Sequence, residues 1–217
     1  MKINWRYTIG EILIVIIGIT IAFSLNNWKQ NRNQKSEKKQ YLESLKQDIE
    51  QEILVLENNQ KKTQEKIALI KELRIELQEE GHDKMMLLKK FFDIPIPIDF
   101  TPNNTTYQTL IHSGDMKLIE DFQLRMAIAE HYTSHQEILK HYERIEKINE
   151  KYIADFYMYK INPKEIADGS MSFLYTPLLT NIINSMAGAY TILLKGNETC
   201  LASNKKLLQT IEESLAN

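Results

Sequence analysis

Apolar side chains recur at steps of three and four through the first half of the chain. Neither glycine nor proline interrupts residues 28–80. The resulting stripe, with consecutive steps of four around Ile49, comprises Leu42, Leu45, Ile49, Ile53, Leu56, Gln60, Thr63, Ile67, Ile70, Arg74 and Leu77. A stripe with this period is typical of an amphipathic helix. The pattern therefore predicts one long helix over residues 31–80, ended by Gly81.

A second stripe with the same period runs through residues 121–161, and Asp121 stands where a helix N-cap is expected. Its members are Leu124, Ile128, His131, His135, Ile138, Tyr142, Ile145, Ile148 and Tyr152. Two long amphipathic helices predict an antiparallel hairpin, whose remaining apolar surface needs a further element. Residues 178–217 supply that element as one or two closing helices on either side of Gly196.

The loop-rich insert between the two stripes, residues 81–120, begins with a short amphipathic helix. Prolines at positions 95, 97 and 102 then disfavour helix in the segment DIPIPIDFTP. We expect a strap that crosses the bundle surface with its apolar side chains tucked in. These are Ile94, Ile96, Ile98 and Phe100. The alternative is a proline-rich ligand for a partner protein. Ser113-Gly114 further on predicts the stop of another short helix.

The N-terminal 30 residues differ from the rest because their apolar residues form a continuous run. Residues 12–25 carry no charge, and the helical pattern extends over residues 7–28, a length of about 33 Å. Residues that favour the headgroup region flank the run: Trp5, Tyr7, Trp28, Lys29 and Arg32. We predict an all-α protein in which a transmembrane anchor, residues 1–30, continues as a helical stalk into a soluble antiparallel bundle, residues 31–217. The alternative is a cleaved signal peptide, against which the carboxylate of Glu11 argues.

Glu11 is an acidic residue at the start of the apolar run. On a helix it falls on the same face as Gly18 and Ala22. The two small residues form a small-x-x-x-small pair, which permits the close approach of a second helix. Two interpretations stay open. Either Glu11 reaches interfacial water at the helix end, where its charge complements the helix dipole, or this face binds a partner or a second copy.

The charge distribution favours a lipid bilayer as the partner of the N-terminal region. Seven Lys or Arg and two Glu lie within residues 1–39, whereas the whole chain has a formal net charge of −2. A basic flank beside an apolar run attracts anionic headgroups, so we expect no nucleic-acid partner. More basic residues follow the run than precede it, which favours a cytoplasmic bundle. The single Cys200 excludes an intramolecular disulfide.

Two blocks of residues are spaced as in a known family. The first comprises Tyr7, Gly10, Glu11, Asn26, Asn27 and Trp28, and the second comprises Tyr107, Leu110, Ser113, Gly114, Leu124, Arg125 and Tyr132. In this order they resemble an uncharacterised family of single-pass membrane proteins from Bacteroidota. The resemblance implies a bacterial inner-membrane location and no particular activity. Members of that family commonly carry a longer basic N-terminus, which implies a periplasmic bundle and opposes the charge count.

The candidate chemistry lies on the second stripe, where His131 and His135 are four residues apart. This spacing places both imidazoles on one face of a helix, as metal ligands require. The sequence contains no HExxH motif and no Glu-x-x-His repeat to supply further ligands. We therefore interpret both residues as buried, hydrogen-bonded histidines and expect no cofactor.

The motifs of catalysis are missing from the sequence, since it contains neither a nucleophile elbow nor a P-loop. We expect a non-enzymatic protein that binds a membrane-protein partner or assembles with itself. One alternative is a sensory or ligand-binding bundle whose pocket is lined by Gln60, Thr63, His131 and His135. Another is a metal enzyme that uses the two histidines, which requires additional ligands brought close by the fold. We interpret His112, next to Ser113, as part of a helix end.

Overall fold

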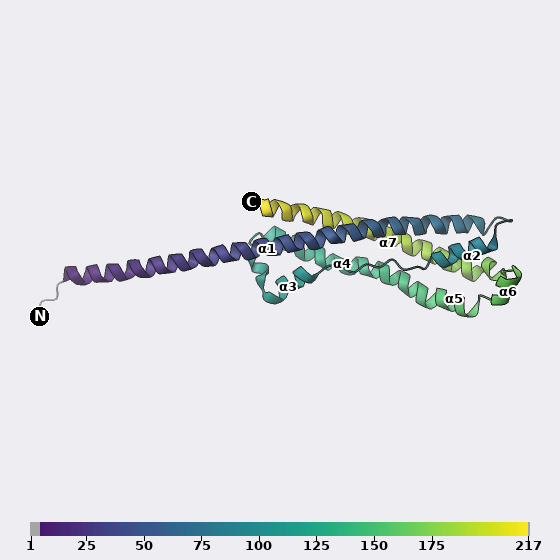
Figure 1. Ribbon diagram of the computed structural model, residues 1–217, viewed down its shortest axis with the longest axis horizontal. Coiled ribbons are helices and arrows are strands. Elements are labelled where there is room, and N and C mark those ends of the chain that lie inside the picture. The colour runs from purple at the N-terminus through teal and green to yellow at the C-terminus, as the bar shows by residue number, and fades with distance from the viewer. Residues whose placement is uncertain (1–4, 217) are drawn as a thin grey trace.

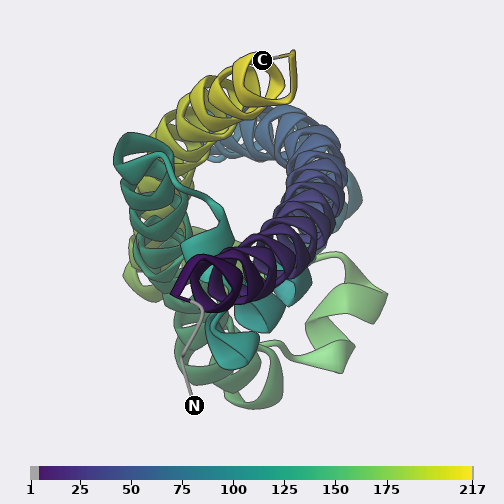
Figure 2. The ribbon, with the colours of Figure 1, turned by 90° about the vertical axis from the view of Figure 1, so that its left-hand side faces the viewer.

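The computed structural model describes residues 5–216, with the side chains of residue 9 and of residues 11–216. Over these residues the protein is all-α, without a strand. Its body consists of three long helices: α1 (Trp5–Glu76), α4 (Phe122–Ile148) and α7 (Pro177–Ala216). α7 packs against both α1 and α4, and Figures 1 and 2 show the three helices arranged lengthwise around a common axis. The prediction of an all-α bundle with a long N-terminal helix is confirmed.

The two parts of α1 have different surroundings. From residue 11 to residue 40 no side chain is buried, whereas Leu42 and Leu45 are fully buried. The N-terminal part projects beyond the bundle as one uninterrupted helix (Figure 1). The helix ends at Glu76, shortly before Gly81, which has a positive φ of 96°. The apolar run is thus joined to the bundle by continuous helix.

The second long helix, expected over residues 121–161, consists of three consecutive segments. α4 is followed by a π-helical turn, η2 (Asn149–Ile153), and by α5 (Ala154–Tyr159). The carboxylate of Asp121 accepts hydrogen bonds from the backbone N–H groups of Gln123 and Leu124, as expected for an N-cap. In the π-helical turn, Nδ2 of Asn149 donates to the carbonyl oxygen of Pro95 at 2.9 Å. This bond ties the helix to the insert.

The insert contains α2 (Lys84–Asp93), α3 (Thr105–Ser113) and the 3₁₀ turn η1 (Asp115–Leu118). The proline-containing strap runs between α2 and α3, and it buries Ile94, Ile98 and Phe100. Ile96 is 53% exposed, so the expectation that it is tucked in was wrong; residues 94–96 form a turn that leaves its side chain on the outside. Gly114, with φ 74°, ends α3 as predicted.

The chain closes through α6 (Pro163–Asp168), the 3₁₀ turn η3 (Ser172–Tyr175) and α7. α7 is a single helix of 40 residues that passes Gly196 without a break. α2 and α6 lie at the end of the bundle opposite the projecting part of α1 (Figure 1).

The apolar core is not continuous along the bundle. One large cluster surrounds Phe91 and Tyr190, and another surrounds Leu45 and Ile211. Between them lies only a small apolar cluster around Leu56. The buried polar side chains of the long helices occupy the rest of this middle section: Glu52, Asn59, Thr63, His131, His135, Asn197 and Asn204.

Candidate functional site

In the middle of the bundle each long helix presents polar residues on its core-facing side. The core-facing positions alternate between steps of three and four: Leu45, Ile49, Glu52, Leu56, Asn59 and Thr63 on α1; Ile128, His131, His135, Ile138, Tyr142 and Ile145 on α4; Tyr190, Leu193, Asn197, Cys200, Asn204 and Leu207 on α7. A sustained alternation of this kind is the seam of a coiled coil. The polar members form two layers across the seam.

The first layer is centred on the carboxylate of Glu52, which is 4% exposed. Its Oε1 lies 2.8 Å from Nε2 of His135 and accepts a hydrogen bond of 3.0 Å from Nδ2 of Asn204. Its Oε2 accepts a bond of 3.3 Å from the backbone N–H of Asn103, in the insert. Three helices and the insert therefore converge on one carboxylate.

His131 belongs to the same layer but leaves one ring nitrogen unpaired. Its Nδ1 lies 3.2 Å from Oγ of Ser203, whereas its Nε2 is buried and has no hydrogen-bond partner among the described residues. This Nε2 lies 3.9 Å from Oε1 of Glu52, which is beyond hydrogen-bond distance. One ligand atom each from Glu52, His131 and His135 lies within 4.8 Å of the other two.

Burial and neighbouring groups determine the protonation of this layer. Burial lowers the pKa of His131 to about 4, with a further lowering from His135 and an opposing effect of Glu52. Burial alone would raise the pKa of Glu52, but its hydrogen bond and electrostatic interaction with His135, together with the hydrogen bond from Asn204, outweigh this effect, and the net pKa is lowered. At neutral pH the layer therefore combines an ionised carboxylate with a neutral His131 imidazole. These are the ligand types of Zn²⁺ and Fe²⁺ sites.

The second layer is built around the hydroxyl group of Tyr142. It accepts a hydrogen bond of 3.0 Å from Nδ2 of Asn59 and donates one of 2.8 Å to Oδ1 of Asn197. Asn59 also donates to the carbonyl oxygen of Asp99 in the strap, at 2.8 Å. Burial raises the pKa of Tyr142 to about 12, so the hydroxyl remains protonated. This layer carries neutral amides and a phenol, and its hydrogen bonds join α1, α4, α7 and the strap.

The core-facing side of α1 differs from the predicted stripe. Glu52 and Asn59 are buried, whereas Ile53 and Gln60, which the stripe includes, are only partly buried. The predicted stripe missed Glu52 because it took consecutive steps of four around Ile49 and so continued to Ile53. Strict alternation of three and four selects Glu52 and Asn59 instead. This regular alternation in the sequence could have identified Glu52, whose carboxylate lies beside the two predicted histidines.

The remaining candidate residues lie on the projecting part of α1. Exposed side chains or positions there include Glu11, Gly18, Ala22, Trp28, Lys29 and Arg32. A Cβ atom added at Gly18 would meet no atom within 4 Å, so this face has room for a neighbouring helix. The side chains of Trp5 and Tyr7 lie outside the described residues.

A basic groove of about 600 Å³ lies where α1 meets the bundle. Its lining comprises Trp28, Asn31, Arg32, Gln34, Lys35 and Lys38 of α1, together with Lys117, Leu118 and Glu120 near η1. Lys117 thus adds a positive charge from a distant part of the chain to the basic flank of the apolar run. Clustered cations beside an apolar helix are suited to anionic headgroups.

In the part of the chain that the structure describes, two helices contain a stretch long and apolar enough to cross a membrane. The stretch in α7 is 39% buried inside the protein, and α7 is a central helix of the bundle. The stretch in α1 is wholly unburied. Both stretches meet the criteria of length and composition, and because its stretch is unburied α1 is the better candidate for association with a membrane.

Comparison with known proteins assigns the chain to a family. No curated protein and no solved structure matches the chain. A family model matches residues 11–184, from the projecting part of α1 to the beginning of α7. This range includes Glu11, the insert, and those residues of the two polar layers that lie on α1 and α4. The chain therefore belongs to DUF6090, a family of unknown function.

Proposed function

We propose that this protein is a single-pass, membrane-anchored helical protein of a bacterial inner membrane that acts through protein–protein interaction or self-assembly, without catalysis. The observation that carries the proposal is the exposed apolar surface of residues 12–25, which projects from the bundle. Such a surface needs a covering of lipid or protein, and its length suits a bilayer.

The continuous helix defines how the bundle is presented. α1 runs from the apolar stretch into the core without a glycine or proline between residues 19 and 76, so the anchor and the bundle move as one stiff element. The basic groove at Trp28 and Lys117 then faces the headgroups. A tether of this kind restricts the bundle to the membrane plane and raises its effective concentration toward membrane partners.

The face that contains Glu11, Gly18 and Ala22 supplies a contact within the bilayer. Gly18 and Ala22 remove side-chain bulk on this face, and the carboxylate of Glu11 gains a polar surrounding when another helix covers it. We assign the partner to the class of membrane helices, which includes a second copy of this chain.

Cysteine crosslinking in native membranes tests this assignment. Cysteine is introduced at Gly18 or Ala22 in a Cys200→Ser background, and adducts are identified by mass spectrometry after oxidation. Thr20→Cys is the matched control, because residue 20 lies at nearly the same depth but on the opposite face of the helix. A specific adduct from positions 18 and 22 and none from position 20 supports the proposal. Equal yields from all three positions would contradict it.

Glu11→Leu tests the role of the carboxylate. We expect membrane insertion to be unchanged, since the substitution makes the run more apolar, and the yield of the Gly18→Cys adduct to fall several-fold. Carbonate extraction measures insertion, and crosslinking measures association. An unchanged adduct yield would show that Glu11 only reaches interfacial water.

A further inference from the structure

We propose that Glu52, His131 and His135 bind one divalent transition-metal ion in the middle of the bundle. The site is independent of the membrane anchor, because all three residues lie in the part of the chain that forms the bundle.

The three ligand atoms are close to the spacing that a metal ion requires. Nε2 of His135 and Nε2 of His131 lie 2.8 Å and 3.9 Å from Oε1 of Glu52. Bond lengths near 2.0–2.2 Å in a tetrahedral site place neighbouring ligand atoms about 3.3 Å apart. The two observed distances lie on either side of this value, and all three atoms lie within 4.8 Å of one another, so small side-chain rotations can bring them to a common ion. Two His and one carboxylate leave at least one coordination position for water or a small ligand.

The unpaired Nε2 of His131 indicates that a metal ion would satisfy this layer better than a proton does. A proton between Glu52 and His135 satisfies their 2.8 Å contact. It leaves Nε2 of His131 buried without a hydrogen-bond partner among the described residues, which costs free energy. When Nδ1–H of His131 donates to Ser203, Nε2 carries a lone pair that faces the carboxylate. A single cation between these atoms contacts all three.

The groups around the ligands resemble the outer shell of a metal site. Metal-bound His usually donates its other ring N–H to an oxygen atom, and this partner fixes the ring. Oγ of Ser203 occupies that position at Nδ1 of His131. Nδ2 of Asn204 and the backbone N–H of Asn103 hold the carboxylate of Glu52.

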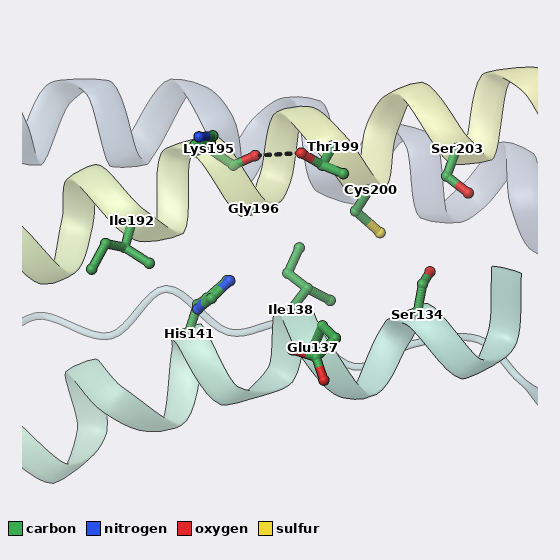
Figure 3. Close-up of a pocket in the computed structure, with 10 residues that line it drawn as sticks. All are labelled: Ser134, Glu137, Ile138, His141, Ile192, Lys195, Gly196, Thr199, Cys200 and Ser203. Atoms are coloured by element: carbon green, nitrogen blue, oxygen red, sulfur yellow. Dashed lines mark hydrogen bonds between the residues drawn. The ribbon is translucent and has the colours of Figure 1, made fainter. Parts of the chain in front are cut away.

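A pocket between α4 and α7 gives a route to the site. It has a volume of about 560 Å³ and includes Ser203, Cys200, Ser134 and Ile138 in its lining. Figure 3 shows Ser134 and Ser203 facing each other across one end of the pocket. Because Ser203 contacts both the pocket and His131, a single side chain separates the pocket from the proposed ligands.

Metal content of the wild-type chain is the first test. The full chain is purified in detergent without a polyhistidine tag, stripped with a chelator and dialysed against Zn²⁺ or Co²⁺. We expect one equivalent of metal per chain by elemental analysis, and for Co²⁺ the visible absorption of a low-coordinate nitrogen and oxygen site. Absence of stoichiometric binding for both ions would overturn the proposal.

Variants then locate the site. We expect Glu52→Gln and His131→Asn to lower the affinity at least about 100-fold, and Ser203→Ala, which removes an outer-shell partner, to lower it about 10-fold. His112→Asn is the matched control, because His112 is an exposed histidine on α3, and it should bind metal as the wild type does. Binding that survives in both Glu52→Gln and His131→Asn would refute the assignment.

A measurement on the wild-type chain avoids the risk that a variant fails to fold. The chain contains five histidines, and imidazole NMR signals report each of them. On addition of Zn²⁺, the signals of His131 and His135 should shift together up to one equivalent. Shifts confined to the other three histidines would place the metal elsewhere and overturn the proposal.

Discussion

The hydroxyl group of Tyr142 connects two buried amides from different helices. Asn59 of α1 donates to it and Asn197 of α7 accepts from it, at 3.0 Å and 2.8 Å. Asn197 is fully buried, so no solvent replaces this bond when it is lost. Buried polar groups contribute little net stability when paired, but they are costly when one partner is removed.

Tyr142→Phe should therefore lower the free energy of unfolding by about 1–3 kcal/mol. The ring still fills its space against Phe100, with which it stacks at a centroid distance of 5.5 Å, so the loss reports the hydroxyl group. Denaturant unfolding followed by circular dichroism measures the change, with the m-value expected to stay constant.

The triple variant Asn59→Leu, Tyr142→Phe, Asn197→Leu is the matched comparison. Replacing all three side chains removes their donors and acceptors together and leaves only the carbonyl oxygen of Asp99 without its donor. The stability of the triple variant should therefore return close to that of the wild type. A triple variant less stable than Tyr142→Phe would mean that the layer contributes stability as well as register.

At the same scale, the sequence predicted the positions of His131 and His135 but not their partner. The apolar residues flanking His131 and His135 fix the face of α4 on which they lie. Glu52 was missed because a carboxylate contradicts the expectation of an apolar stripe, and its burial depends on hydrogen bonds from α4, α7 and the insert. Such bonds join residues far apart in the chain, which periodicity does not reveal.

At the scale of elements, periodicity predicted the buried face of α4, and that of α1 only approximately, but not which helix covers each face. We expected the first two long helices to pair and the last to close the bundle, whereas α7 packs along both of the others. An apolar stripe is complementary to any other stripe of the same period. The choice depends on length and on side-chain volume, which only the packed structure shows.

Two glycines test whether backbone conformation, rather than contacts, sets the stability of these elements. Gly188 lies exposed within α7, and Gly114 ends α3 with φ 74°. A Cβ atom at either position would meet no atom within 4 Å. Gly188→Ala should raise the free energy of unfolding by about 0.5–1 kcal/mol, because alanine favours helix. Gly114→Ala should lower it by about 1–2 kcal/mol, because a Cβ atom is strained at positive φ.

Both variants can be measured by urea unfolding of the full chain in the same detergent. Opposite signs are the expected result. The same sign for both would show that solvent exposure or detergent contacts, and not φ, dominate at these positions.

At the scale of the whole molecule, the proposed anchor and the bundle share a helix but not a core. The first buried side chain described on α1 is Leu42. The exposed apolar residues before Leu42 are not part of the bundle core. Their burial in lipid would therefore be an equilibrium separate from the folding of the bundle. The stability of the bundle should then be independent of the membrane.

A fragment of residues 36–217 should consequently fold alone and remain soluble. It keeps both polar layers and all the buried residues of α1, beginning at Leu42. Its free energy of unfolding should therefore differ from that of the full chain by less than about 1 kcal/mol, which corresponds to a shift in the unfolding temperature of about 4 °C or less.

A fragment of residues 48–217 is the matched control. It lacks Leu42 and Leu45, which are 1% and 0% exposed, and loss of two buried leucines should cost at least about 4 kcal/mol. Thermal unfolding and membrane flotation compare the three chains: the full chain should float with vesicles, and neither fragment should. If the longer fragment unfolds well below the full chain, the apolar run stabilises the bundle directly, and anchor and bundle form one cooperative unit.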